Sequence, residues 1–212
     1  MTIKDKNNCF RGCKFKSQKK NIGIALVPPP DKILGIVVSQ DPPISWYKDV
    51  YKHSKKNSDK ENQRLILFKS GIPRLLFNRI TEFMGHRIED EDEKYLRHML
   101  FYKVYWTHLH KCFTGGSKKP LKFQPKNAEQ CAKGWLEEEF SHVISNKTRF
   151  IIALGNIVKR TLEKQNISNK YRKLKFIKLP HPSGRNRKWN NKNDTVILEA
   201  IQDLLGLCKT VA

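Results

Sequence analysis

The sequence predicts an α/β fold with three layers, in which a central, mainly parallel four-stranded sheet lies between helices. Short apolar runs rich in β-branched and aromatic residues alternate with longer amphipathic segments along the chain. The stretches at 32–40 and 149–155 contain the continuous apolar runs "ILGIVV" and "FIIALG", which are typical of parallel strands buried on both faces. Alternation of strands and helices favours a parallel sheet with right-handed crossovers.

Each element is expected from its local pattern. Strands are expected at 32–40, 101–112, 149–155 and 173–184. Helices are expected at 71–87, 128–145, 156–165 and 193–209. In the first helix, Pro73 lies near the start, and the apolar face is expected to consist of Leu75, Leu76, Ile80 and Phe83. Asn193 or Asp194 is expected to cap the last helix, and Cys208 on that helix is expected to be a core residue.

The chain is strongly basic. It has 42 Lys and Arg against 20 Asp and Glu, a formal net charge of +22 with a pI of about 9.9. This charge is typical of proteins that bind polyanions, and nucleic acid is the expected partner. The alternative is a solvated lysine-rich surface, but such surfaces usually carry matching Glu, which this chain lacks.

The organisation along the chain is that of one domain with an arm. Residues 1–30 are basic, contain cysteines and end in the polyproline stretch "VPPP", so we expect them to pack as an arm on a domain at 31–212. No run approaches 18 apolar residues, and the polar N-terminus does not resemble a signal peptide. We therefore expect an intracellular monomer, cytoplasmic or nucleoid-associated and not bound to a membrane. Its five cysteines are then expected to be thiols or metal ligands, not disulfides.

Three of the four expected strands end in polar corners. These are "SQDPP", "THLHKC" and "LPHPSG". In open α/β sheets, ligands bind beyond the carboxyl ends of the strands, so the three corners together predict a site. Asp41 stands out because two prolines brace it, although an Asp here can also simply cap a turn.

These corners carry a resemblance to the uracil-DNA glycosylase superfamily over most of the chain. "VVSQDPP" resembles the first motif of the family 1 enzymes, GQDPY, and "LPHPSGRNR" resembles their second motif, which begins His-Pro-Ser. "VYWTHLHKC" is similar to the strand VYITNVVKC of the iron-sulfur family 4 enzymes, and "FIIALGNIVKRTL" is similar to their later strand, glycine and helix. The layout is closest to family 4, with a family 1-like first motif.

The resemblance implies roles for two catalytic residues. A glycosylase flips a base out of the stack and breaks its bond to the sugar, which leaves positive charge on the sugar and negative charge on the base. Asp41 would stabilise the sugar and orient the attacking water, and His181 would donate a hydrogen bond to the base oxygen. A lone His is, however, often structural or simply exposed.

The resemblance also implies residues that bind the base and the DNA. Gln40 and His108 would contact the base, and Phe68, aligned with FVGRAGQLL of family 4, would stack on it, although Phe68 could equally be core. The DNA-binding residues would be Ser183, Gly184, Arg185 and Arg187, with Arg185 as the wedge; solvent exposure alone is the alternative for the arginines.

Two positions depart from the family pattern. His108 stands where the family has the asparagine that reads uracil, and Pro43 stands where family 1 has the tyrosine that excludes thymine. Trp46 or Tyr47 could line the base-binding pocket instead. Uracil is the expected base, with hypoxanthine, another deaminated base or a relaxed range left open.

Four cysteines match the positions of the family 4 cluster ligands in order: Cys9, Cys13, Cys112 and Cys131. The resemblance implies a [4Fe-4S] cluster, with zinc as the chemical alternative and unligated thiols as the plain one. The first pair is spaced CxxxC where the family has CxxC.

From the resemblance as a whole, we expect a DNA glycosylase of base excision repair. The alternatives are a non-catalytic nucleic-acid-binding member of the superfamily and, less consistent with the charge, an iron-sulfur electron carrier.

Overall fold

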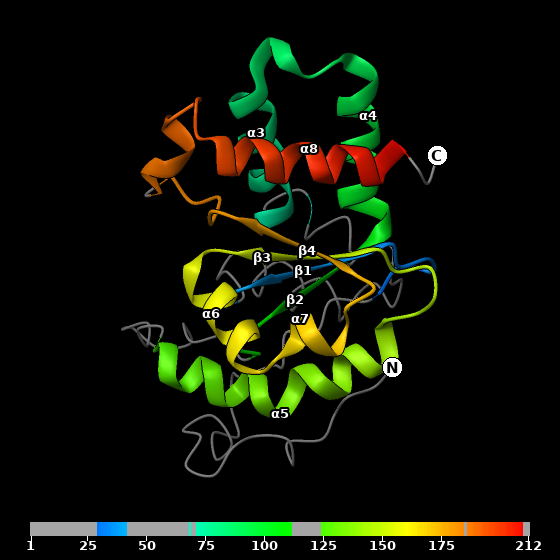
Figure 1. The fold of residues 1–212 in the computed structure, drawn as a ribbon, viewed down its shortest axis with the longest axis vertical. Coiled ribbons are helices and arrows are strands. Elements are labelled where there is room, and N and C mark those ends of the chain that lie inside the picture. The colour runs from blue at the N-terminus through cyan, green and yellow to red at the C-terminus, as the bar shows by residue number, and fades with distance from the viewer. Residues whose placement is uncertain (1–28, 42–67, 69–70, 112–123, 185, 210–212) are drawn as a thin grey trace, which may run out of the picture.

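The computed structural model describes residues 29–41, 68, 71–111, 124–184 and 186–209. Within them lies a sheet of four strands: β1 (Gly35–Ser39), β2 (Val104–His108), β3 (Phe150–Leu154) and β4 (Lys175–Leu179). All neighbouring strands are parallel, and their order is β2-β1-β3-β4. The predicted α/β fold with a parallel four-stranded sheet is confirmed (Figure 1).

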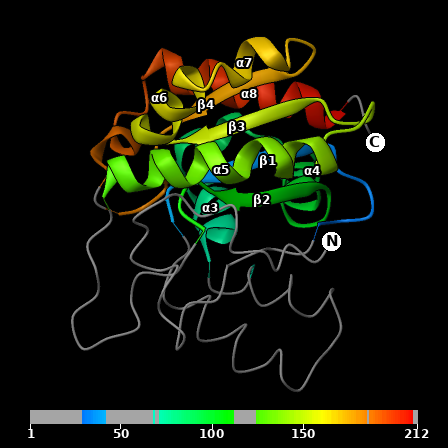
Figure 2. The ribbon, with the colours of Figure 1, turned by 90° about the horizontal axis from the view of Figure 1, so that it is seen from below.

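Helices cover both faces of this sheet. One face carries α3 (Ile72–Met84), α4 (Asp90–His98) and α8 (Thr195–Lys209), and the other carries α5 (Pro125–Val143), α6 (Asn156–Lys164) and α7 (Ile167–Lys170), as Figures 1 and 2 show. Alternate strand residues point to opposite layers, so Val37 and Ile152 belong to the core under α3 and α8, whereas Ile36 and Ile151 belong to the core under α5 and α6.

The central strands need a glycine to approach each other. A Cβ atom on Gly35 would lie 2.0 Å from the ring of Phe150, which fills the space beside it. Any larger residue at position 35 would displace that ring from the core. Cys208 is buried as expected, with its Sγ 3.4 Å from Sδ of Met99.

The predicted helices are confirmed, with two refinements. Leu76, Ile80 and Phe83 of α3 are buried, but Leu75 is 46% exposed, so including it in the apolar face was wrong. Of the two candidate caps for α8, Asp194 is the one that acts, because its Oδ1 accepts a hydrogen bond from the Ile197 amide at 3.2 Å.

The sequence pattern missed α4 and misplaced the start of β2. Only Leu96 of α4 is buried, so the helix has no apolar stripe; acidic residues fill its first turn, and Arg97 and His98 lie in its last, which suits the helix dipole. It continues into a π-helical turn, η3 (Met99–Lys103), where a strand was expected from residue 101. The indole of Trp106 donates to the Leu100 carbonyl at 3.0 Å and stabilises this turn.

Residues 1–28 of the predicted arm lie outside the part of the chain that the structure describes. None of the helices within the described ranges combines the length and apolar character needed to cross a membrane.

Candidate active site at the carboxyl edge of the sheet

Backbone pairing continues past the ends of the strands. The Leu109 and His110 amides donate to the carbonyls of Ser39 and Gln40, both at 2.9 Å, and the Gly155 amide donates to the Leu179 carbonyl at 2.8 Å. The segments that follow β1, β2 and β3 are therefore fixed at one edge of the sheet, where β4 also ends. This edge lies at the left of Figure 1, where β4 leads toward α8.

Gly155 brings two of these segments into contact. Its φ of +90° is a conformation that glycine adopts readily and other residues rarely do. A Cβ atom there would lie 3.3 Å from Cβ of His181 and 3.7 Å from Nε2 of Gln40. Gln40 and His181 thus flank the same small residue. Gly155 was not predicted to belong to the site, although its place between an apolar strand and a helix was a signal in the sequence.

Asp41 directly follows Gln40 at this edge and is partly buried. Burial raises the pKa of its carboxyl to about 6 from an ordinary value of 3.8. The charged form of Asp41 is therefore costly to the fold. Such a raised pKa is typical of functional carboxyl groups near the surface of a cleft.

The segment after β4 fixes the orientation of His181. The Ser183 amide donates to Nδ1 of His181 at 3.3 Å, and the indole of the buried Trp189 donates to the His181 carbonyl at 3.1 Å. Burial lowers the pKa of His181, so the ring is neutral at neutral pH. Because Nδ1 accepts a hydrogen bond, the proton of the neutral ring is on Nε2, which can donate to a ligand.

Arg79 of α3 holds this segment from the other layer. Its Nε donates to the Pro182 carbonyl at 3.4 Å, and its Nη1 pairs with Glu82 at 2.9 Å. A Cβ atom on Gly184 would lie 3.7 Å from Nη2 of the same guanidinium. This role could not be predicted from the sequence, since Arg79 is one of several polar residues on an amphipathic helix.

His108 ends β2 beside Ser39 of β1 and is 4% exposed. Burial, together with the nearby Lys111 and His110, lowers the pKa of His108 to about 3. Its imidazole is therefore neutral and retains one donor and one acceptor nitrogen.

The sequence profile of the Uracil DNA glycosylase superfamily matches residues 54–205, more than two thirds of the chain. The chain belongs to this superfamily. No curated protein sequence matches it. Membership supports a glycosylase that acts on DNA; neither a family within the superfamily nor a particular base follows from it.

The other predicted base- and DNA-binding residues vary in their placement. Phe68 is 4% exposed and packs edge-on against Phe101, with ring centroids 4.8 Å apart, so it lies among the core residues. Ser183 is partly exposed, and Gly184 and Arg187 are exposed on the segment after β4. Four further residues lie outside the described part of the chain: Arg185, Pro43, Trp46 and Tyr47.

Of the four predicted cluster ligands, only Cys131 lies in the described ranges; Cys9, Cys13 and Cys112 do not. Cys131 is buried on α5, and its Sγ accepts the Lys111 amide at 3.5 Å. Lys111 directly precedes Cys112 in the sequence. Among the described residues, no group of three or more potential ligands could hold a metal ion.

A buried charge network lies beside Cys131 and links β2 to α5. Glu139 accepts from the Tyr105 hydroxyl at 2.6 Å and from the Thr107 hydroxyl at 2.9 Å. The Lys111 ammonium pairs with Glu139 and also contacts Thr107, and both charged side chains are almost completely buried. Burial and Glu139 raise the pKa of Tyr105, which keeps its hydroxyl protonated as a donor.

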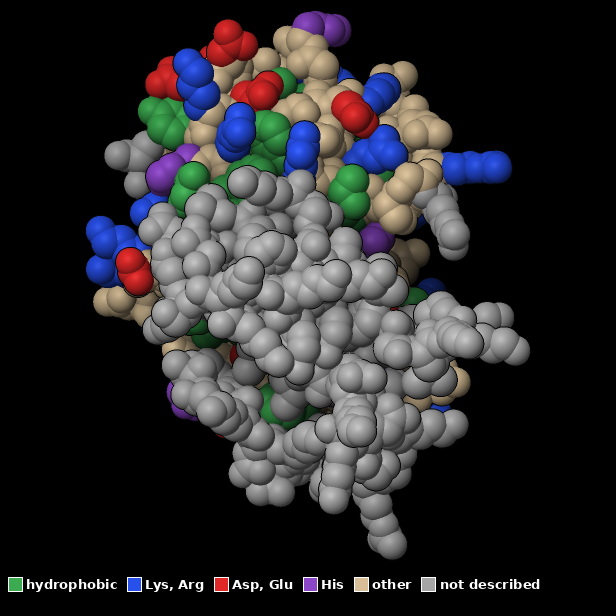
Figure 3. Space-filling model, turned by 180° about the vertical axis from the view of Figure 1, so that it is seen from behind, with side chains coloured by type: hydrophobic (Ala, Val, Ile, Leu, Met, Phe, Trp, Pro, Cys, Tyr) green, Lys and Arg blue, Asp and Glu red, His purple; other side chains and the backbone are tan. Residues whose placement is uncertain are grey.

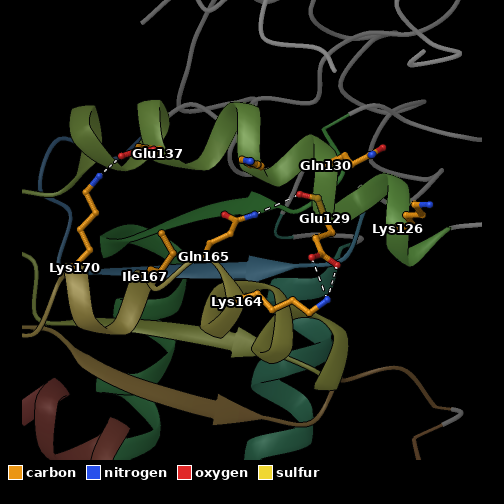
Figure 4. A pocket seen from close by; sticks show the side chains of 9 residues that line it. Lys126, Glu129, Gln130, Glu137, Lys164, Gln165, Ile167 and Lys170 are labelled. Atoms are coloured by element: carbon orange, nitrogen blue, oxygen red, sulfur yellow. Dashed lines mark hydrogen bonds and ion pairs between the residues drawn. The ribbon is translucent and has the colours of Figure 1, made fainter. Parts of the chain in front are cut away.

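Basic side chains lie on the surface around this core. Figure 3 shows one face, with Lys and Arg along its left edge and across its upper part and with fewer Asp and Glu among them. An open groove of about 640 Å³ between α5 and the α6–α7 region is different, because its charges pair across it (Figure 4). Lys164 lies 3.1 Å from Glu129, and Lys170 pairs with Glu137. We interpret this groove as the contact between α5 and the α6–α7 region, which ion pairs stabilise.

Removing the buried ammonium should destabilise the protein strongly. We expect Lys111→Met to lower the free energy of unfolding by about 3–5 kcal/mol, because Glu139 is left buried without its counter-charge. Adding Glu139→Gln should recover part of that loss. Lys164→Met, which breaks an exposed pair, should cost at most about 1 kcal/mol. Urea unfolding followed by circular dichroism measures all three, and equal costs for the two single variants would contradict the assigned network.

Proposed function

We propose that this protein is a DNA glycosylase that flips a deaminated base, with uracil as the expected one, out of DNA and hydrolyses its N-glycosidic bond. The observation that carries the proposal is the convergence at Gly155, where Gln40 and His181 flank one glycine and Asp41 follows directly in the chain. Membership of the superfamily supports the same reaction class.

Asp41 supplies the charge that the sugar needs. When the bond to the base breaks, positive charge develops on the sugar, and an ionised carboxylate below it stabilises that charge and orients a water for attack. Burial makes the free carboxylate costly, so a cationic sugar beside Asp41 offsets part of this cost.

His181 takes the complementary role at the leaving base. Its neutral ring carries the proton on Nε2, since Nδ1 accepts the Ser183 amide. A neutral donor stabilises the negative charge that develops on a base oxygen without itself losing a proton. Trp189 and Arg79 act as positioning residues, because each binds a carbonyl in the segment that carries this ring.

Base recognition is assigned to Gln40 and His108. The neutral His108 offers one donor and one acceptor, where an asparagine would present an amide. This difference leaves hypoxanthine or another deaminated base as possible substrates besides uracil. Phe68 is the proposed stacking residue, and its ring is held edge-on by Phe101.

DNA contacts are assigned to the segment after β4. Ser183, Gly184, Arg185 and Arg187 are the proposed residues, and the exposure of Gly184 and Arg187 supports this. A cavity of about 290 Å³ adjoins Gly155 and is also lined by Lys159 and Lys188. These ammonium groups suit backbone phosphates close to the flipped nucleotide.

The proposed [4Fe-4S] cluster would be held by Cys9, Cys13, Cys112 and Cys131, with zinc as the alternative. Cys131 fits this proposal in two respects: it is buried, and its sulfur accepts an amide hydrogen bond of the kind that tunes cluster thiolates. The cluster would tie the arm to the domain. No step of the proposed reaction passes through it.

Base release tests the proposed function. Labelled single-stranded and duplex oligonucleotides, each with one uracil, hypoxanthine or mispaired thymine, are incubated with the protein, and abasic sites are read by alkaline cleavage. We expect uracil release, lowered at least about a hundredfold by Asp41→Asn because the sugar charge is no longer balanced. Asp203→Asn on α8 removes a carboxylate far from this edge and should leave release unchanged.

The folding of Asp41→Asn separates lost chemistry from lost structure. The folded-state pKa of Asp41 lies above its unfolded value, so its ionisation lowers stability as pH rises from about 4 to about 6. The variant should thus be more stable than the parent above pH 6, by about 1–2 kcal/mol after allowing for partial exposure.

Tight DNA binding with no release of any base by the parent protein would favour the non-catalytic alternative.

The pH dependence follows from the same carboxyl group. Only ionised Asp41 is active, and its pKa is about 6, so the single-turnover rate should rise about tenfold per pH unit below 6 and level off above about 7. The neutral His181 remains competent across the plateau. Rates in buffers of constant ionic strength from pH 4.5 to 8.5 give the profile. A rate that falls between pH 5 and 7 would contradict the role of Asp41.

The cluster has its own measurement, independent of activity. Protein purified without oxygen should contain about four iron atoms and four sulfides per chain and absorb near ~400 nm. Cys131→Ser should lower the iron content severalfold, whereas Cys208→Ala, which also removes a buried thiol, should not. Zinc without colour would establish the alternative, and the absence of both metals would refute a metal site.

A further inference from the structure

A second pocket lies at the opposite edge of the sheet, at the amino ends of the strands. Its volume is about 720 Å³, and it is formed where α4, η3 and the end of α8 meet the segments that lead into β1 and β3. The amino ends of the strands lie at the right-hand side of Figure 1, opposite their carboxyl ends. The proposed glycosylase reaction uses none of the residues that line it.

The lining is cationic. It includes Lys32, Lys94, Lys103, Lys147 and Arg149, which together carry a formal charge of +5 from four lysines and one arginine. His98 also lines it, and no acidic side chain does. Concentrating like charges in a concave site raises the local potential and attracts anions.

These charges are not neutralised within the part of the chain that the structure describes. None of the four lysines forms an ion pair there, and the Arg149 guanidinium donates to the Asn146 carbonyl at 2.5 Å. Two acidic groups of α4 already have partners, since Asp92 pairs with Lys209 at 2.9 Å and Glu91 accepts from the Tyr95 hydroxyl. The groove beside α5 shows the contrast, because there Lys164 and Lys170 pair with carboxylates.

The frame of the pocket is rigid. The Leu34 amide donates to the Lys103 carbonyl, and the Arg149 amide donates to the Leu34 carbonyl, both at 2.8 Å. These bonds extend the sheet one residue before β1, β2 and β3. The backbones that carry Lys103 and Arg149 are therefore held side by side before any ligand binds, which lowers the entropy cost of binding.

The inner wall is apolar. Leu34, Met99 and Cys208 line the pocket between the cations, and Met99 and Cys208 are buried and in contact. Burial and the nearby Asp92 raise the pKa of the Cys208 thiol to about 12, so this wall carries no thiolate charge at neutral pH. A ligand that fits has an anionic group for the rim and a flat or apolar part for the wall.

We propose that this pocket binds a nucleotide, with its phosphates at Lys103 and Arg149 and its base against the wall formed by Leu34 and Met99. The volume is in the range of sites for ligands of this size. The nucleotide is either free or one unit of a nucleic-acid strand. The inference is independent of the glycosylase reaction, because the two sites lie at opposite edges of the sheet.

The test compares two variants of the full chain that lose the same charge. Lys103→Gln with Arg149→Gln removes two cations from the pocket, and Lys126→Gln with Lys133→Gln removes two from the groove beside α5. Binding of adenosine triphosphate and of a twelve-nucleotide thymine strand is measured by calorimetry at fixed ionic strength. We expect the pocket variant to bind at least one probe about tenfold more weakly than the parent, and the control variant to stay within about twofold.

Each result either identifies the source of the bound nucleotide or contradicts the proposed nucleotide site. Weaker binding of the triphosphate alone establishes a free nucleotide as the ligand, and weaker binding of the strand alone establishes a strand unit. If both variants bind both probes equally well, the proposal is wrong. Should the first variant fail to fold, Lys32→Gln with Lys147→Gln replaces it, since both side chains are exposed. In the parent protein, the triphosphate should also protect Lys94 and Lys103, but not Lys126 or Lys133, from an amine-acetylating reagent mapped by mass spectrometry.

Discussion

The candidate active site depends on backbone hydrogen bonds that continue the parallel sheet beyond its strands. Because Gln40 accepts the His110 amide and Gly155 donates to Leu179, the segments after β1, β2 and β3 are held in place by pairing that continues the sheet. His181 then follows β4 by two residues, and its segment is bound from the opposite layer by Arg79. A site built on such fixed backbone can hold its polar groups ready for a developing charge, which is how preorganised electrostatics lowers a barrier.

The sequence predicted best those elements whose burial is uniform. β1 and β3 are covered on both faces, so their residues are apolar throughout and the pattern is plain. α4 could not be predicted, because it buries Leu96 alone and depends on its terminal charges. In the site, Asp41, His181 and Gln40 stood out as polar residues at strand ends. Arg79 did not, since its contact with Pro182 spans 103 positions of the chain and no local pattern encodes it.

Buried ionisable groups are handled in two ways in this protein. Lys111 and Glu139 are buried as a pair with two hydroxyl donors, which satisfies both charges and fixes α5 against β2. His108 and His181 are instead kept neutral by burial. Asp41 follows neither course fully, because its pKa of about 6 leaves it ionised at neutral pH in a poorly solvated place. The ionised carboxylate therefore lowers the free energy of unfolding. Such a cost is expected where the carboxylate has a function.

The topology also connects Asp41 to the superfamily match, although the matched residues 54–205 begin after it. β2, β3 and β4 all lie within the match, but β1 stands between β2 and β3 in the sheet. Among the described strands β2 pairs only with β1, so without β1 the two matched parts of this sheet would not meet. β1 is therefore an integral strand of the same fold. Since Asp41 follows β1 by two residues, its position at the carboxyl edge is set by the matched strands on either side of it.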